Sequence, residues 1–162
     1  MKKYNILFLC THNSARSVLG EALASTHQSG RFVGYSAGST PGTKVNPFAA
    51  EIAQNLGYET HNLRSKSWDE YASPDAPVMD FIITVCDDAA GEVCPVWPGH
   101  PATAHWGFAD PSKVEGSDED KRQAFKDVMW GLKKRIDMLA ALPLETLDAI
   151  SIHHELKNLA KV

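Results

Sequence analysis

A cysteine and an arginine, separated by five small or polar residues, could together carry out nucleophilic chemistry. Cys10 closes an apolar run, and the loop THNSA leads from it to Arg16 at the start of a helix-like segment. A loop of small residues that enters a helix points backbone N–H groups inward, where they can bind an oxyanion. The guanidinium of Arg16 offers a planar fork of donors that suits a tetrahedral oxyanion.

The same surroundings favour the thiolate form of Cys10. The positive end of the helix dipole, the charge of Arg16 and the hydroxyl of Ser17 each stabilise a negative sulfur. The alternative is a buried cysteine that merely ends a strand, with Arg16 a surface charge. Because the spacing coincides with a strand, a polar loop and a helix start, we expect a nucleophilic cysteine facing a bound anion. The expected oxyanion-binding residues are Thr11, His12, Asn13, Ser14, Ala15, Arg16 and Ser17.

Alternating strands and helices must position this loop. Short apolar runs predict buried strands, and apolar residues at helical spacing predict helices. The expected strands are residues 4–9, 32–36 and 80–85, and the expected helices are 17–27, one capped at Asn46-Pro47 that ends before Gly57, and 118–142. This order predicts an α/β fold with a parallel sheet and helices on both faces, and sites at the carboxyl ends of strands, where Cys10 and Cys86 fall.

Length and composition limit the classes of function. The 162 residues predict a single domain, 1–162, in which residues 144–162 form a C-terminal helical extension. A net charge of -4 and a sequence pI of about 5.9 argue against nucleic acid as a partner. The apolar run behind Lys2 and Lys3 is too short for a signal peptide, and no window approaches a membrane span. We therefore expect a soluble cytoplasmic protein with no membrane partner.

Cysteine usage points to reactive thiols. The chain has three cysteines, Cys10, Cys86 and Cys94, which is an odd number without a secretory context. A structural disulfide framework is improbable in that setting. Redox or nucleophilic chemistry is the expected use of these thiols.

The segment Cys10-Thr11-His12-Asn13-Ser14-Ala15-Arg16-Ser17 resembles the phosphate loop of the low-molecular-weight protein tyrosine phosphatases and their arsenate reductase relatives. Three further blocks resemble the reductase branch: YSAG at 35–38, ITVC at 83–86 and HWGFADP at 105–111. We expect the resemblance to cover roughly the first 140 residues, which is most of the chain. The resemblance implies a four-stranded parallel sheet flanked by helices, with arsenate or phosphate held by the loop.

The resemblance also implies a role for each site residue. Cys10 attacks arsenate, and Asp110, which precedes Pro111, is the general acid for the leaving oxygen. Cys86 resolves the thiol–arsenate adduct, and Cys94 closes a Cys86–Cys94 disulfide that an external reductant reopens. Asp110 could instead be only a turn cap before proline. The alternative function is a phosphatase that hydrolyses phosphate monoesters through a phosphocysteine at Cys10.

The resemblance implies no tightly bound cofactor but an external thiol reductant. Thioredoxin-coupled members hold six residues between the two relay cysteines, whereas residues 87–93 make seven here. Thioredoxin, glutaredoxin with glutathione, and another low-molecular-weight thiol therefore all stay open as the reductant. His12 stands where relatives often have glycine, and histidine tolerates a left-handed backbone only moderately well.

The thioredoxin branch can also carry a structural potassium site, to which Asn13, Glu21 and Ser36 correspond. The acidic ligand expected near residues 66–68 is missing, or shifted to Asp69, so no metal is predicted.

A zinc-binding module is the alternative from a different class of protein. Cys86, Cys94, His100 and His105 are all zinc-ligand types within residues 86–105. Their spacing matches neither of the usual paired knuckle patterns. A zinc module would also leave the Cys10 loop unexplained, so the enzyme is the preferred interpretation.

Overall fold

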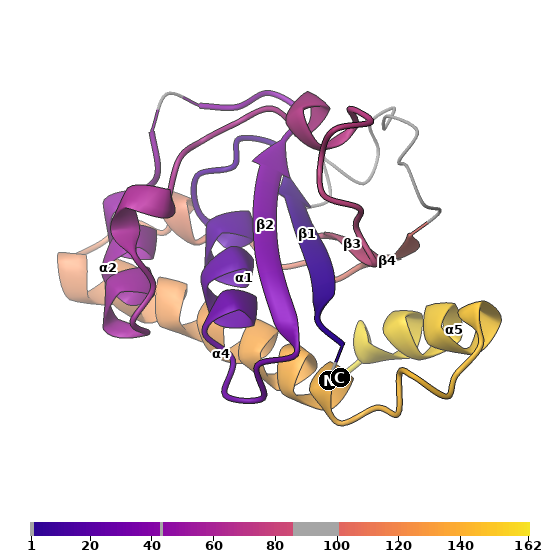
Figure 1. The fold of residues 1–162 in the computed structure, drawn as a ribbon. Helices are drawn as coiled ribbons and strands as arrows, with labels where there is room; N and C mark the ends of the chain where they lie inside the picture. The colour runs from indigo at the N-terminus through magenta and orange to yellow at the C-terminus, as the bar shows by residue number, and fades with distance from the viewer. Residues whose placement is uncertain (1, 43, 86–100) are drawn as a thin grey trace.

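The computed structural model describes residues 2–42, 44–85 and 101–162, which contain a four-stranded parallel sheet (Figure 1). The spatial order is β2-β1-β3-β4. The strands are β1 (Tyr4–Cys10), β2 (Phe32–Gly38), β3 (Phe81–Thr84) and β4 (Ala102–His105). Because the strands are parallel, their carboxyl ends meet at one edge, where Cys10 pairs with Gly38. The predicted α/β fold with a parallel sheet is confirmed.

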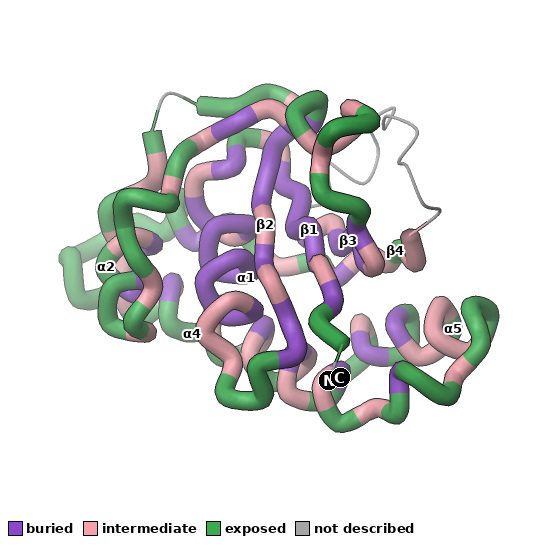
Figure 2. Tube along the Cα trace, viewed as in Figure 1, coloured by how far each residue is buried: buried purple, intermediate pink, exposed green. Residues whose placement is uncertain are grey.

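Both faces of the sheet are covered around its central strands, which explains why β1 and β3 are nearly continuous apolar runs. In β1 the side chains alternate, so Ile6 and Phe8 belong to one core cluster and Leu7 and Leu9 to another. Figure 2 shows β1 buried in the centre of the molecule. The first face carries α1 (Arg16–Ser25), α4 (Asp118–Ala140) and α5 (Ala149–Leu159). Over the described ranges, the second face carries the 3-10 helix η2 (Trp68–Tyr71).

Local capping interactions set where the helices begin. Asn46 caps α2 (Pro47–Asn55) by accepting a hydrogen bond from the amide of Phe48, and Pro47 takes the first helical position. Ser117 and Asp120 form a capping box at the start of α4. The predicted helices are confirmed, with ends within two residues of those expected. None of the described helices is long and apolar enough to cross a lipid bilayer.

Several short elements have no counterpart among the patterns read from the chain. β4 is a four-residue edge strand whose side chains are half-buried or exposed, so it lacks an apolar run. The 3-10 helices η1 (Thr60–Asn62), η2 and η3 (Pro111–Lys113) are too short to show a period.

Trp106 ties the C-terminal helix to the sheet. This residue directly follows β4, is fully buried, and its Nε1 donates to the Leu156 carbonyl of α5 at 3.1 Å. Leu156 and Leu159 are buried in the same core cluster. The helical pattern expected at 144–162 is thus a helix over Ala149–Leu159. That the whole chain is one domain stays a prediction.

We expect Trp106→Phe to lower the free energy of unfolding by about 1–3 kcal/mol, because the Leu156 carbonyl loses its buried donor and the smaller ring leaves a void. Urea unfolding followed by far-ultraviolet circular dichroism measures the change. Trp130→Phe is the matched control, since Trp130 is 59% exposed and its replacement should stay within about 0.5 kcal/mol. Equal stabilities of the two variants would contradict the role given to the indole N–H.

Candidate active site

Cys10 lies at the carboxyl end of β1 and directly before the loop that leads into α1. It is 4% exposed. In the described structure Ala15, the N-cap residue, supplies no side-chain acceptor to the first-turn amides of α1. These amides and the helix dipole favour negative charge beside the start of α1.

The loop is held from outside through its carbonyl groups. Three of them accept hydrogen bonds of 2.8–3.0 Å from amides of the chain that follows β2: Thr11 from Thr40, His12 from Gly42 and Ser14 from Asn46. The C=O and N–H of a trans peptide point in opposite directions, and the described residues contain no cis peptide. The amides that follow these carbonyls, those of His12, Asn13 and Ala15, therefore turn to the inside of the loop.

Asn13 carries the unusual backbone of this loop. Its φ is +49°, in the left-handed region that asparagine tolerates better than most residues. The residue with the left-handed backbone is thus Asn13. His12, which replaces the glycine of many relatives, does not have to adopt that conformation. The fully buried side chain of Asn13 donates from Nδ2 to Ser17 Oγ at 2.9 Å, which links the loop to the first turn of α1.

A buried cation lies behind Asn13. Lys66 is 6% exposed, and both its amide (3.0 Å) and its Nζ (3.4 Å) donate to Asn13 Oδ1. The same Nζ lies 3.4 Å from Ser36 Oγ and 3.6 Å from Glu21 Oε1. Burial lowers the pKa of Lys66, and the carboxylate of Glu21 opposes that shift. The ammonium and the carboxylate form a buried ion pair beside the loop.

This cluster does not fit the potassium site that the family resemblance implies. The three expected oxygen ligands, on Asn13, Glu21 and Ser36, all surround the ammonium of Lys66. Tyr58 donates to the second carboxylate oxygen of Glu21, and its pKa is raised by burial and by that hydrogen bond. An ammonium and a potassium ion carry the same charge and cannot share one position.

Arg16 and Asp110 are neighbours at the rim of the loop. Nη1 of Arg16 donates to the Phe108 carbonyl at 2.8 Å, and Nη2 lies 3.6 Å from Asp110 Oδ2. Asp110 also caps η3 by accepting from the amide and the hydroxyl of Ser112. Partial burial raises the pKa of Asp110, but the Ser112 hydrogen bonds and the charge of Arg16 outweigh it, so the pKa is below its usual value. Asp110 is therefore an ionised turn cap that pairs with Arg16.

The structure brings together part of the predicted site. Cys10, the loop and Arg16 form one continuous strand–loop–helix unit, and Asp110 lies next to Arg16. The two relay cysteines, Cys86 and Cys94, lie outside the described residues. The relay geometry therefore stays a prediction.

Two residues that shape the site did not stand out in the sequence. Lys66 supports Asn13 from a position 53 residues away, and Phe108 supplies the carbonyl that binds Arg16. Glu21 was a signal for such a residue. It lies on the apolar helix after the loop and is buried, and a buried carboxylate requires a hydrogen-bonding or cationic partner. The sequence did not indicate which residue that partner is.

Among the residues that the structure describes, no group of three or more His, Cys, Asp and Glu side chains could hold a metal ion. Of the four zinc-type residues, His105 is described, and its Nδ1 lies 2.8 Å from Thr84 Oγ1. The other three, Cys86, Cys94 and His100, lie outside the described residues.

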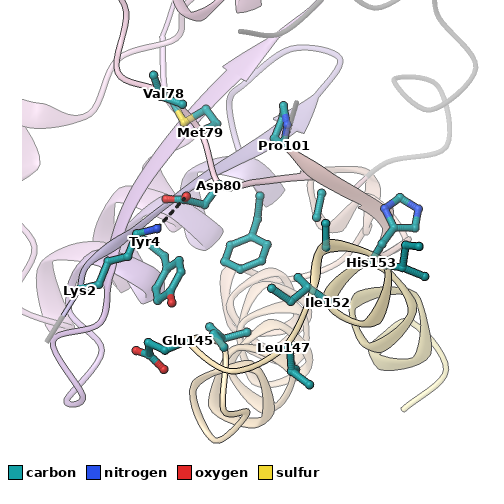
Figure 3. A pocket seen from close by; sticks show the side chains of 15 residues that line it. Lys2, Tyr4, Val78, Met79, Asp80, Pro101, Glu145, Leu147, Ile152 and His153 are labelled. Atoms are coloured by element: carbon teal, nitrogen blue, oxygen red, sulfur yellow. Dashed lines mark ion pairs between the residues drawn. The ribbon is translucent and has the colours of Figure 1, made fainter. Parts of the chain in front are cut away.

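A cavity of about 740 Å³ lies at the other end of the sheet (Figure 3). Tyr4, Phe81 and Ile152 line it, and Lys2 pairs there with Asp80 at 3.9 Å. These residues mark the amino ends of β1 and β3 and the start of α5. Sites in parallel α/β sheets lie at the carboxyl ends of strands, so the cavity is separate from the candidate active site.

Comparison with known proteins identifies relatives over most of the chain. Residues 5–151 match the family model described as low molecular weight phosphotyrosine protein phosphatase. The arsenate reductase of Halalkalibacterium halodurans is 36% identical over 140 residues, which cover 86% of this chain and 97% of the relative. The arsenate reductase of Bacillus licheniformis is 37% identical over 141 residues, with the same two coverages, 86% and 97%.

A solved structure has the same fold. The thioredoxin-dependent arsenate reductase of Corynebacterium glutamicum aligns with a TM-score of 0.58 at 24% identity, and the match covers 85% of this chain and 60% of that one. The four-stranded parallel sheet with flanking helices is thus shared. Together with the family match over residues 5–151, the sheet and the Cys10 loop lead to one conclusion: the chain belongs to the low molecular weight phosphotyrosine protein phosphatase family.

Proposed function

We propose that the chain is an arsenate reductase in which Cys10 is the nucleophile. The observation that carries this proposal is the loop after Cys10, whose outward carbonyls turn several amides to its inside at the start of α1. Such a loop suits a tetrahedral oxyanion and stabilises a thiolate. The arsenate reductases that are 36% and 37% identical to this chain support arsenate as that oxyanion.

In the first step, the thiolate of Cys10 attacks arsenic, and one arsenate oxygen leaves as water after it is protonated. Asp110 is the proposed proton donor, although Ser112 and Arg16 keep its pKa low. An arsenate that engages Arg16 brings negative charge next to Asp110 and offsets the positive charge of Arg16. Both changes raise the pKa of Asp110, so substrate binding prepares the carboxyl to hold and donate a proton.

In the second step, the thiolate of Cys86 attacks the sulfur of Cys10 and forms a Cys10–Cys86 disulfide. The electron pair of the sulfur–arsenic bond stays on arsenic, which leaves as arsenite, so As(V) is reduced to As(III). Cys94 then attacks Cys86, which moves the disulfide to Cys86–Cys94 and releases Cys10 as a thiolate. An external dithiol finally supplies two electrons and two protons to reopen that disulfide.

Thioredoxin is the first candidate for the external dithiol, and glutaredoxin with glutathione is the second. The structural relative from Corynebacterium glutamicum is described as thioredoxin-dependent. The seven residues at 87–93 do not decide between the two systems. Assays coupled to NADPH oxidation, each with one purified thiol system and arsenate, test both the reaction and the reductant. Absence of arsenate-dependent turnover with every thiol system would contradict the proposed function.

The alternative is the hydrolysis of phosphate monoesters through a phosphocysteine at Cys10. This reaction needs the nucleophile, Arg16 and the acid, but no second thiol. It gives no function to Cys86 and Cys94, which is why reduction is the proposed function.

We expect Cys10→Ser to lower arsenate reduction and any phosphatase activity by at least about a thousand-fold. The reason is that a serine hydroxyl in this loop stays protonated and is a poor nucleophile. Steady-state rates with arsenate and with an aryl phosphate measure the loss. Phosphate binding should survive and serves as the control for folding, and substantial turnover of either substrate would remove Cys10 from the mechanism.

Arg16→Lys should lower turnover about 10²–10³-fold although it keeps the charge, because an ammonium cannot offer two parallel donors to a tetrahedral anion. The same assay compares it with Arg122→Lys, a matched control on α4 whose guanidinium pairs with Glu51. The control should keep its activity. Near-normal kinetics for Arg16→Lys would place Arg16 outside the oxyanion site.

The relay predicts different losses for the other two cysteines. Cys86→Ser should stop arsenate reduction but leave any aryl phosphate hydrolysis by the wild type largely intact, because hydrolysis needs no second thiol. Cys94→Ser should block steady turnover yet still release arsenite once, ending in a Cys10–Cys86 disulfide or a mixed disulfide with an external thiol. Mass spectrometry of the oxidised wild-type protein should find Cys86 bonded to Cys94. Wild-type arsenate reduction by both variants would eliminate the relay.

A further inference from the structure

The buried ammonium of Lys66 has no role in the proposed reaction steps, yet it contacts the residue with the least common backbone in the oxyanion loop. Asn13 has a φ of +49° and is fully buried. Its side-chain oxygen accepts from the amide and from Nζ of Lys66, and its side-chain nitrogen donates to Ser17. Asn13 is therefore fixed at both ends of its amide group, and Lys66 fixes one of them.

We propose that Lys66 is a positioning residue for the oxyanion loop, and that its ammonium is a built-in cation that takes the place of a bound monovalent metal ion. The potassium ligands implied by the family resemblance, on Asn13, Glu21 and Ser36, surround this ammonium at 3.4–3.6 Å. Lys66 also donates to the Arg64 carbonyl at 3.1 Å. One chain residue thus supplies the charge and the contacts that a metal ion would supply.

The position of Lys66 couples the loop to the sheet. Its carbonyl accepts from the amide of Gly38 at 2.9 Å, at the end of β2, and its amide binds Asn13. Next to it, Ser65 Oγ donates to the His12 carbonyl at 2.7 Å. The peptide between residues 12 and 13 is therefore held from both sides, with its carbonyl outward and the Asn13 amide inward.

The contact with Glu21 shows why a cation suits this position of Lys66. Glu21 is 4% exposed, and its two carboxyl oxygens accept hydrogen bonds from Ser36 and Tyr58. A buried carboxylate needs a counter-charge nearby. Lys66 Nζ lies 3.6 Å from Glu21 Oε1 and so compensates the carboxylate while it holds Asn13. The proposal rests on the proposed function only in that the loop binds a tetrahedral oxyanion.

The test is the affinity of the full reduced chain for inorganic phosphate, measured by titration calorimetry. In tetramethylammonium chloride, Lys66→Ala should bind phosphate about tenfold or more weakly than the wild type, which corresponds to about 1.4 kcal/mol. Ammonium or potassium chloride at the same ionic strength should restore most of that affinity, because these cations fit the space that the side chain leaves. The wild type and Lys126→Ala, an exposed control, should not respond to the cation.

Two results would overturn the proposal. The first is a Lys66→Ala protein that binds phosphate like the wild type in tetramethylammonium chloride. The second is a small cation that restores the melting temperature but not phosphate affinity, because a purely structural ion pair would behave that way.

If Lys66→Ala does not fold, Lys66→Met combined with Glu21→Gln removes both charges of the pair at nearly constant volume. We expect weakened phosphate binding in that double variant, and wild-type affinity would overturn the proposal. Arsenate reduction does not enter these measurements. A chain whose phosphate affinity depends on Lys66 but that reduces no arsenate would therefore contradict only the proposed function.

Discussion

The close approach of β2 to the loop after Cys10 is the constraint on which the rest of the site depends. Gly38 pairs with Cys10, and a Cβ on Gly38 would lie 2.5 Å from the Thr11 carbonyl oxygen, so the approach requires glycine. The chain that follows β2 then supplies the amides that donate hydrogen bonds to the carbonyls of the loop. The carbonyl of Lys66 accepts a hydrogen bond from the Gly38 amide, and the amide of Lys66 donates a hydrogen bond to the side chain of Asn13. The direction of the loop amides is thus a consequence of sheet packing and not of the loop sequence alone.

Among the described residues, the ion pairs Lys66–Glu21 and Arg16–Asp110 lie next to the loop, and they differ in how far their side chains are exposed to solvent. The side chains of Lys66 and Glu21 are 5% and 6% exposed, so breaking this pair would leave an uncompensated buried charge. Arg16 and Asp110 are 13% and 19% exposed, and they lie 3.6 Å apart. An incoming oxyanion can replace Asp110 at Arg16 at little cost, because water and Ser112 still solvate the carboxylate. In the proposed mechanism the buried pair holds the loop, and the partly exposed pair takes part in binding the oxyanion.

Local patterns account for what could be predicted from the sequence. The apolar runs of β1 to β3 and the Asn46-Pro47 cap lie within a few neighbouring residues, so they were visible without the fold. β4 was missed as a pattern because an edge strand of four partly exposed residues has no apolar run. Lys66 was missed because its partner Asn13 is 53 residues away, and such a contact exists only once β2 lies beside the loop. The role of the two cysteines beyond β3 stays a prediction.

The segment after β4, which carries the carbonyl bound by Arg16, is anchored in the helical layer. The ring of Phe108 packs where α4 has Gly131, since a Cβ there would lie 2.5 Å from Phe108 Cε1, and the guanidinium of Arg135 lies 4.8 Å from the ring centroid. Trp106, two residues earlier, donates a hydrogen bond from its indole N–H to the Leu156 carbonyl of α5. The Phe108 carbonyl is therefore placed by these helix contacts and by the hydrogen bond from the Phe108 amide to the Val85 carbonyl, and not by Arg16 alone. Because of this, Arg16 can turn from Asp110 toward an oxyanion while one of its nitrogens keeps a fixed acceptor, which limits the entropy lost when the anion binds.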